Sequence, residues 1–445
     1  MALRDLFLIV FVFGSLPWML AKPYVGILFW CWLGYMNPHR LSWGVAYNLP
    51  FSQVVALTTM VGLIFSKEPK RIPLTGLTIT WLLFIIWMNI TTVYAMYPDI
   101  AYEQYIKVMK IQLMTFLTIV LMGSKEKLHM LLWVIVLSLG FYGVKGGIFT
   151  IIHGGEFRVW GPPGSFVEDN NGLAISLIMM LPLVKYLRSI TENRWVRQGL
   201  LIAMFLMSVS VVGSYSRAAL ISGLSMASFL WVKSKSNKVI TLMAIAILIP
   251  FLYLFMPQTW HDRMTSIYTT NEEGQYEGSA QSRIFAWKMI LNLANHRPLG
   301  AGFSPWEPMT YRLYSDDVRS NSGMAAHSIY MSPLAEHGWI GLILFVSILL
   351  MAWRTGSWVI CHCRGDPELE WLDNLTRMVQ LALIAYCTGG TFHQMTYYDL
   401  PWDMIAIIVL SKALLQKRIK ETGQAKGLVP QWVTPFQAAK GIPSP

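Results

Sequence analysis

The chain has 445 residues, of which 54% are hydrophobic and only 13% are charged, and its mean hydropathy is +0.46. Because about a quarter of the residues in a soluble domain are charged, this composition excludes an ordinary soluble fold and indicates a polytopic membrane protein. The formal net charge of +11 points to anionic membrane lipids as partners rather than to a nucleic acid, since basic loops gather on the cytoplasmic face of a bilayer.

Membrane-spanning segments recur along almost the whole chain. A spanning helix needs about 20 largely apolar residues, and the alternating pattern of a barrel strand is absent. Residues 4–36 are also apolar, but Pro17 and Pro23 interrupt them, so they form either one long bent helix or a short hairpin. We therefore predict an all-α fold with about twelve transmembrane helices. Besides residues 4–36, the predicted spans lie near residues 51–66, 75–95, 104–122, 127–150, 172–187, 197–213, 216–232, 238–256, 328–353, 375–390 and 399–415.

The distribution of Lys and Arg over the connections predicts the orientation of these spans. Basic residues fall on every second connection, among them 66–71, 185–197 and 354–377, and on the tail after Lys412. These segments are expected in the cytoplasm. The alternate connections are poorer in Lys and Arg for their length and are expected outside; they include a mostly polar segment at 257–326.

Metal and cofactor motifs are absent from the sequence. The run Cys361-His-Cys363 lies in a connection expected in the cytoplasm, and two thiols with one imidazole do not complete a tetrahedral site. There is no P-loop, no dinucleotide fingerprint, no His-Glu-x-x-His and no Asp-x-Asp pair on an outward loop. We therefore predict that the protein uses neither a metal nor a cofactor.

Three places on the outward side carry residues of the types that bind phosphate or transfer protons. The first is Gly213-Ser-Tyr-Ser-Arg217, a tight connection that sets one arginine at the outer end of a span. An arginine so close to the hydrocarbon region is costly unless it snorkels or has a partner, and its planar set of donors suits a phosphate. A snorkelling anchor at a helix end is the simpler interpretation.

The second place is Ser279-Ala-Gln-Ser-Arg283-Ile-Phe-Ala-Trp287, followed by Pro298-Leu-Gly-Ala-Gly-Phe303. Arg283, Trp287 and Leu291 recur every four residues, which predicts one face of a short amphipathic helix lying along the outer interface. The glycine pair lets the backbone turn sharply after it. A surface helix that only packs on the spans is the alternative.

The third place, from Ala326-His327-Ser to Gly338-Trp-Ile-Gly341, opens a span from the outer side. A histidine at such an edge suits a general base because its ordinary pKa lies near neutrality, although many histidines at helix starts are caps or packed polar groups. His337 is the rival candidate. Ten residues correspond to about 280° around a helix, so the two histidines do not share a helix face, and we choose His327.

Taken together, these motifs resemble the O-antigen ligase family of bacterial inner-membrane proteins. The resemblance rests on the Ser-Arg at a span junction, the Ser-Arg-x-x-x-Trp helix with its Pro-Leu-Gly-x-Gly end, and His-Ser followed nine residues later by Gly-x-x-Gly. It is specific over 213–341 and extends over most of the chain in the number of spans and the place of the large loop. Residues 36–51 look most like a branch described as O-glycosylation ligases associated with exopolysaccharide and exosortase systems.

The resemblance implies a metal-independent glycosyltransferase with a fold similar to the GT-C-like membrane enzymes. The donor would be a polysaccharide on undecaprenyl diphosphate, and the acceptor a hydroxyl of the lipid A–core oligosaccharide in lipopolysaccharide biosynthesis. Arg217 and Arg283 would bind the diphosphate, and His327 would act as the general base of an inverting transfer. The chain would then comprise an N-terminal transmembrane bundle (1–256), a periplasmic loop region with short amphipathic helices (257–326), C-terminal transmembrane helices (327–416) and a cytoplasmic tail (417–445).

Other assignments stay open at this stage. A polysaccharide polymerase and a protein O-oligosaccharyltransferase use the same donor, and the sequence does not separate their acceptors. A transporter of lipid-linked glycan would also have about twelve spans, but it predicts internal repeats and charges near the bilayer midplane. Further candidates for substrate binding are Arg158 and Asn170, for sugar or phosphate, and Tyr398 and Asp399, for an acceptor.

Overall fold

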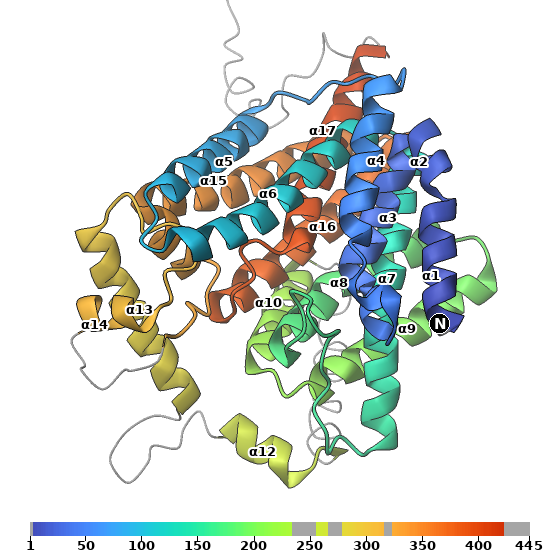
Figure 1. The fold of residues 1–445 in the computed structure, drawn as a ribbon. Helices are drawn as coiled ribbons and strands as arrows, with labels where there is room; N and C mark the ends of the chain where they lie inside the picture. The colour runs from blue at the N-terminus through green and yellow to red at the C-terminus, as the bar shows by residue number, and fades with distance from the viewer. Residues whose placement is uncertain (1–2, 234–254, 266–277, 316–322, 422–445) are drawn as a thin grey trace, which may run out of the picture.

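The computed structural model describes residues 3–233, 255–265, 278–315 and 323–421, and every regular element in this part of the chain is a helix (Figure 1). This confirms the all-α prediction. The longer helices are α1 (Leu3–Gly14), α2 (Leu16–Ala21), α3 (Pro23–Met36), α4 (Phe51–Phe65), α5 (Gly76–Val93), α6 (Pro98–Leu121), α7 (Lys125–Ile152), α8 (Asn170–Ile190), α9 (Arg194–Gly213), α10 (Arg217–Lys233), α12 (Gln258–Thr265), α13 (Gly278–His296), α14 (Pro308–Tyr314), α15 (Met331–Cys363), α16 (Glu370–Gly389) and α17 (Asp399–Glu421).

Seven helical segments in the described part are long and apolar enough to cross a membrane. Two of the other predicted spans form shorter apolar helices, α4 and α10, and the predicted spans at 375–390 and 399–415 form the long but more polar helices α16 and α17. Most of the predicted span at 238–256 lies outside the described residues. The structure thus supports a multi-pass membrane protein and leaves the number twelve as a prediction.

Residues 4–36 form a hairpin and not one bent helix. Pro17 and Pro23 each occupy the first turn of a new helix, where the missing N–H leaves no bond unmade. The chain reverses there, and the Phe11 ring of α1 lies 5.2 Å from Phe29 and 5.5 Å from Trp32 of α3. The hairpin alternative is therefore the correct one.

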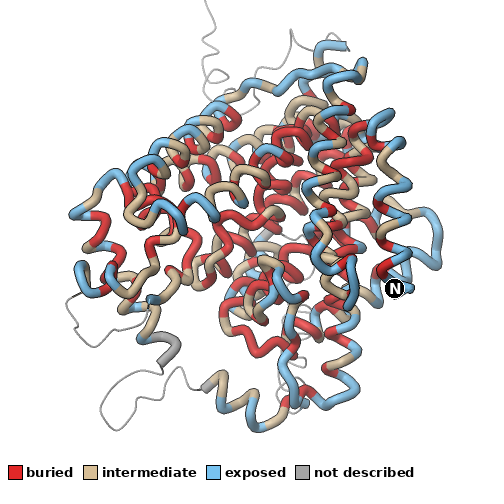
Figure 2. The backbone as a smooth tube through the Cα atoms, in the orientation of Figure 1, coloured by how far each residue is buried: buried red, intermediate tan, exposed pale blue. Residues whose placement is uncertain are grey.

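The most deeply buried candidate span is α8, with 72% of its apolar stretch buried against 22% for the segment Leu3–Ala21 (Figure 2). It packs against α9 and α16, and α7 packs closely along α9. Small residues permit that approach: a Cβ at Gly147 of α7 would lie 2.1 Å from the Leu206 carbonyl oxygen. This central helix begins at Asn170, which contacts the turn before Arg217.

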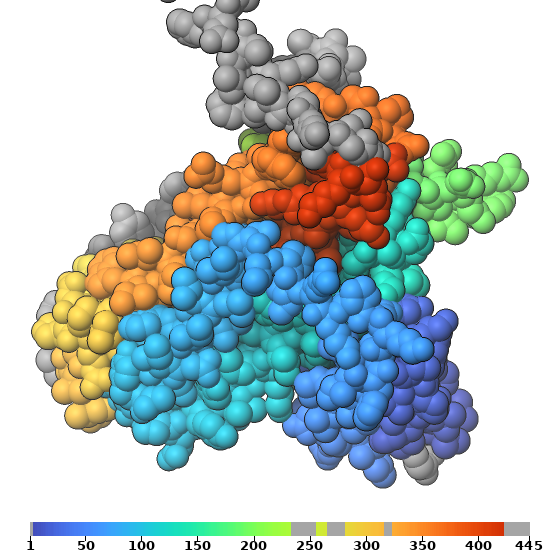
Figure 3. Space-filling model, turned by 90° about the horizontal axis from the view of Figure 1, so that it is seen from above, coloured from blue at the N-terminus to red at the C-terminus, as the bar shows by residue number. Residues whose placement is uncertain are grey.

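The helix α13 and the segments after it form their own small core. The buried face of α13, with Ala286, Ile290 and Leu293, packs against Ala326, which precedes α15, and Leu334 in the first turn of α15. Helices α13 and α14 lie on one flank of the molecule, beside the blue α5–α6 region and the orange α15 region (Figure 3). The helix carrying Arg283 has 19 residues, so it is longer than the short helix that the sequence predicts.

Candidate functional site

A cavity of about 260 Å³ brings together three arginines from separate elements. Arg217 is the first residue of α10, Arg263 belongs to the short helix α12, and Arg283 lies in the first half of α13. Asn171, Tyr215, Trp287 and Phe392 also line the cavity. Three guanidinium groups that line one cavity suit a ligand with several anionic oxygens.

The turn before Arg217 is held by the start of α8. The Asn170 amide donates to the Ser214 carbonyl oxygen at 2.7 Å, and the Ser216 hydroxyl donates to the Asn171 side-chain oxygen at 2.8 Å. Tyr215 adopts a left-handed φ of 61° and donates its hydroxyl to the Gly155 carbonyl oxygen at 2.7 Å. The turn thereby places Arg217 at the N-terminus of α10, where the helix dipole also favours an anion.

Arg283 is positioned by its neighbour Trp287, one helical turn further along α13. The Trp287 indole donates to the Ala326 carbonyl oxygen at 2.9 Å, and its ring stacks on Phe392 with centroids 6.4 Å apart. The indole therefore lines the cavity and packs on protein. The placement of this helix along the outer interface stays a prediction.

The glycines of Pro298-Leu-Gly-Ala-Gly-Phe303 let this segment dock on the first turns of α15. Gly300 and Gly302 have φ values of 102° and 83°, which side chains rarely adopt. Ala301 and Gly302 donate their N–H groups to the carbonyl oxygens of Ala335 and Glu336 at 3.0 and 2.9 Å. A Cβ at Gly300 would lie 2.5 Å from the Glu336 carbonyl oxygen. The segment thus couples the helix of Arg283 to the element that follows His327.

His327 lies in the irregular segment before α15 and has a left-handed φ of 47°. The N–H of Ile329 donates to the Gly390 carbonyl oxygen at 2.8 Å, which ties the segment to the turn after α16. Burial lowers the pKa of His327 below its usual 6.5, and the nearby charges of Arg283 and His393 lower it further, while Asp169 opposes them. A neutral imidazole beside an arginine cavity is suited to accept a proton.

His337 is fully buried and has partners of its own. Its Nδ1 lies 2.7 Å from the Thr91 hydroxyl, and its Nε2 lies 2.9 Å from the Tyr397 hydroxyl, which also donates to Glu336 at 2.5 Å. The backbone at Gly338 is non-helical, with a φ of 67°. The helical spacing argument against His337 is therefore wrong, because His327 precedes the helix and the helix breaks at Gly338. Neither His337 nor His327 is among the residues that line the arginine cavity, but the charge of the lining residue Arg283 acts on His327 and lowers its pKa.

The family comparison covers this part of the chain. Residues 202–346 match the family model described as O-Antigen ligase, and residues 3–192 match one described as a family of unknown function (DUF5935). Residues 202–346 belong to the O-antigen ligase family. No curated protein matches the chain. The matched region contains the three cavity arginines and His327, and its family comprises glycosyltransferase-like ligases and polymerases.

Several residues that line this cavity were not predicted from the sequence. Arg263 lies on a helix of eight residues without an obvious motif. Asn171 and Phe392 come from elements outside residues 202–346, and only the position of Asn171 beside the predicted Asn170 gave a signal. They reach the cavity because α8 and the turn after α16 pack around it.

None of the further substrate-binding candidates is among the residues that line the cavity. Arg158 is exposed, with its guanidinium 5.5 Å from the centre of the Tyr215 ring. Asn170 is buried and holds the turn before Arg217. Tyr398 is buried against Tyr35 at a ring distance of 6.1 Å, and Asp399 begins α17. Their roles toward sugar, phosphate or acceptor stay predictions.

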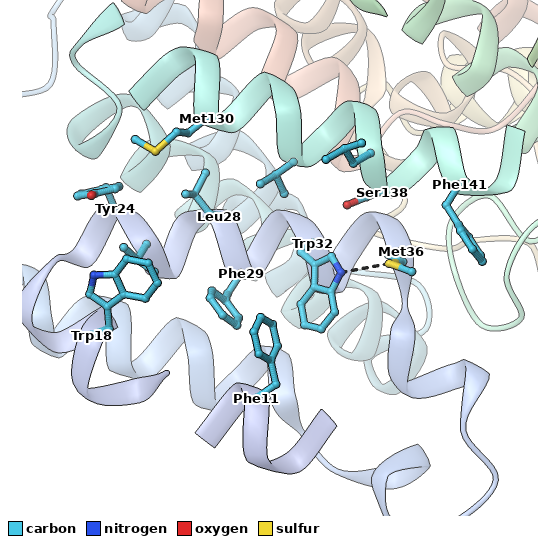
Figure 4. A pocket seen from close by; sticks show the side chains of 13 residues that line it. Phe11, Trp18, Tyr24, Leu28, Phe29, Trp32, Met36, Met130, Ser138 and Phe141 are labelled. Atoms are coloured by element: carbon cyan, nitrogen blue, oxygen red, sulfur yellow. Dashed lines mark hydrogen bonds between the residues drawn. The ribbon is translucent and has the colours of Figure 1, made fainter. Parts of the chain in front are cut away.

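A larger cavity of about 490 Å³ lies between the N-terminal hairpin and α7 (Figure 4). Phe11, Trp18, Phe29, Trp32 and Phe141 give it an aromatic lining, and none of its lining residues is charged. Such a wall offers dispersion contacts to hydrocarbon but no group for proton transfer or phosphate binding. The smaller arginine cavity is therefore the candidate site for such chemistry.

Proposed function

We propose that the protein is an O-antigen ligase that transfers a polysaccharide from undecaprenyl diphosphate to the lipid A–core oligosaccharide at the periplasmic face of the bacterial inner membrane. The observation that carries this proposal is the convergence of Arg217, Arg263 and Arg283 on one cavity within the matched domain. His327, close enough to Arg283 for its charge to lower the histidine pKa, supplies the second half of the chemistry.

The arginines fit the leaving group of this reaction. When the bond between the anomeric carbon and phosphate breaks, negative charge develops on the diphosphate, and guanidinium groups fixed beforehand around it stabilise that charge. Arg217 is the first residue of α10, so the partial positive charge at the N-terminus of this helix also stabilises the diphosphate. Three positive side chains suffice to oppose a diphosphate without a metal ion.

His327 is suited to act as the general base for the acceptor hydroxyl. The acceptor hydroxyl attacks the anomeric carbon from the face opposite the diphosphate, and the neutral imidazole takes its proton. The bond from carbon to phosphate breaks as the bond from carbon to the acceptor oxygen forms, so the transfer inverts the anomeric centre. Undecaprenyl diphosphate leaves with the electron pair.

The test uses the purified full-length protein in lipid nanodiscs with an undecaprenyl-diphosphate glycan. Separate reactions contain a lipid A–core oligosaccharide, a second lipid-linked glycan, or a peptide with Ser and Thr, and mass spectrometry follows which acceptor gains the glycan. Gain of mass by the lipid A–core alone supports the proposal. Gain by the lipid-linked glycan or the peptide instead identifies a polymerase or a protein O-oligosaccharyltransferase, and the ligase assignment is then overturned.

A further inference from the structure

The side chains of Asp169 and His393 are in contact at the edge of the arginine cavity. His393 Nε2 lies 3.2 Å from Asp169 Oδ2, and both side chains belong to residues beside cavity-lining ones, Asn171 and Phe392. Gly172 leaves room for the pair, because a Cβ there would lie 3.0 Å from Asp169 Oδ2 and 3.1 Å from His393 Nε2. Neither member of the pair lies within the matched domain at 202–346.

The carboxylate of Asp169 is held ionised by its surroundings. Its Oδ1 accepts the N–H groups of Asn171 and Gly172 at 2.9 and 3.1 Å, so the residue is the N-cap of α8. Burial alone would raise the pKa of Asp169, but the hydrogen bond and charge of His393 and these two N–H groups outweigh it and bring the pKa to about 2. Asp169 therefore carries a full negative charge at neutral pH.

The pair of Asp169 and His393 lies beside the segment of His327, because the N–H groups of Ile329 and His393 both donate to the Gly390 carbonyl oxygen, at 2.8 and 3.3 Å. Among the residues that the structure describes, Arg283 of α13, His393 after α16 and Asp169 before α8 act electrostatically on the imidazole, and of these three Asp169 favours the protonated form. A base that takes a proton beside an arginine forms two positive charges close together, which is costly in a partly buried site. A fixed carboxylate offsets that cost.

We propose that Asp169 is a positioning residue of the transfer site: its carboxylate, oriented by His393 and the N-terminus of α8, stabilises the imidazolium that His327 becomes when it takes the acceptor proton. This inference rests on the proposed function, because it assigns a proton to His327. In this arrangement the negative charge of Asp169 stabilises protonated His327. The arginines alone bind the diphosphate. The arrangement also gives the N-terminal half of the chain a part in the chemistry.

The substitution Asp169→Asn tests the negative charge of Asp169 separately from its role as the N-cap of α8. Asparagine is an equally good N-cap, so α8 keeps its two capping hydrogen bonds while the negative charge is removed. The pKa of His327 should then fall. His393→Gln removes a group whose electrostatic effect lowers the pKa of His327, so this pKa should rise. Glu168→Gln is the matched control, because Glu168 is exposed and accepts its bond from Gly164.

The experiment measures the rate at which diethyl pyrocarbonate modifies His327 as a function of pH, with peptide mass spectrometry to isolate that residue. The reagent attacks the neutral imidazole, so the midpoint of the rate profile reports the pKa without donor or acceptor. In parallel, the acid limb of kcat/KM for transfer is measured for the same variants. We expect both to move to lower pH in Asp169→Asn, to higher pH in His393→Gln, and to stay in place in Glu168→Gln.

An unchanged midpoint in folded Asp169→Asn overturns the inference and leaves Asp169 as a helix cap alone. A midpoint that moves while the acid limb of kcat/KM stays in place also overturns it, because the charge then reaches His327 without serving transfer. If the wild-type protein transfers glycan to none of the acceptors, the proposed function fails instead. The modification profile distinguishes the two failures, since it requires no turnover.

Discussion

Arg283 and His327, which belong to separate segments, lie close enough for the charge of the guanidinium to lower the pKa of the imidazole. The same arginine lines the cavity that we assign to the diphosphate, so one residue links the leaving-group side of the site to the base. When an anionic diphosphate binds, part of this positive charge is neutralised, and the basicity of His327 is expected to rise. The base would thus gain strength when the donor is in place.

This relationship predicts a pH dependence. Because burial and Arg283 lower the pKa of His327, the acid limb of kcat/KM in the free enzyme should have its midpoint below pH 6.5, with activity lost as pH falls through it. Arg283→Gln removes the positive charge, so the modification midpoint of His327 should move to higher pH even though transfer is lost. A midpoint that moves to lower pH would contradict the arrangement.

Arg217→Lys and Arg283→Lys should each cut transfer severely, because lysine keeps the charge but loses the planar set of donors. Since both residues line one cavity, the double variant should cost less than the sum of the two single changes. Initial rates with saturating acceptor measure this. Strict additivity would mean that the two groups do not act on the same leaving group. Arg194→Lys, at an exposed position outside the cavity lining, serves as the control.

His327→Ala and His337→Ala are expected to fail in different ways. Loss of a general base costs about 10²–10⁴ in turnover, so the His327 variant should stay folded and inserted but lose transfer. His337→Ala leaves the buried Thr91 and Tyr397 hydroxyls without their partner and should lower thermal stability, by about 1–3 kcal/mol. Near wild-type transfer by His327→Ala, with turnover lost in a stable His337→Ala protein, would transfer the role of base to His337.

Glu336 offers a test of the coupling between α15 and the Pro298–Phe303 segment. Its carboxylate accepts from the Ser304 N–H at 3.0 Å and from the Tyr397 hydroxyl at 2.5 Å. Glutamine can keep one oxygen on Ser304 and turn its amide toward Tyr397, so Glu336→Gln should be tolerated. Glu336→Leu leaves both donors unsatisfied and should lower the unfolding temperature and the activity together. Equal stability of the two variants, measured by thermal unfolding in nanodiscs, would rule out this role.

Transfer is expected to survive an excess of chelator. Three guanidinium groups line the cavity and provide the positive charge that a divalent cation supplies in metal-dependent transferases. The measurement compares initial rates with and without EDTA after extensive dialysis. Loss of turnover that is restored by added magnesium or manganese would show that the arginines do not suffice.

The sequence by itself determined the class of protein, an all-helical chain with several helices long and apolar enough to cross a membrane. Runs of apolar residues of spanning length predict helices, and the helices α5 to α9 and α15 confirm these segments, because the cost of burying an unbonded backbone in lipid leaves few alternatives. The tight turn before Arg217 and the sharp turn at Gly300 and Gly302 were also predicted from the sequence. Such turns depend on local backbone geometry, which specific residue types control.

Only the tertiary structure decided which segments meet at the site. Arg263, Asn171 and the pair of Asp169 with His393 come from α12, the start of α8 and the turn after α16. Membrane helices are apolar on nearly every side, so hydrophobic periodicity does not indicate which faces pack together. That choice depends on close fits, such as Gly147 against Leu206, and on buried hydrogen bonds, such as the one from Asn170 to Ser214. These contacts join residues far apart in sequence, and they bring the pair of Asp169 and His393 to the edge of the cavity that Arg217 and Arg283 line.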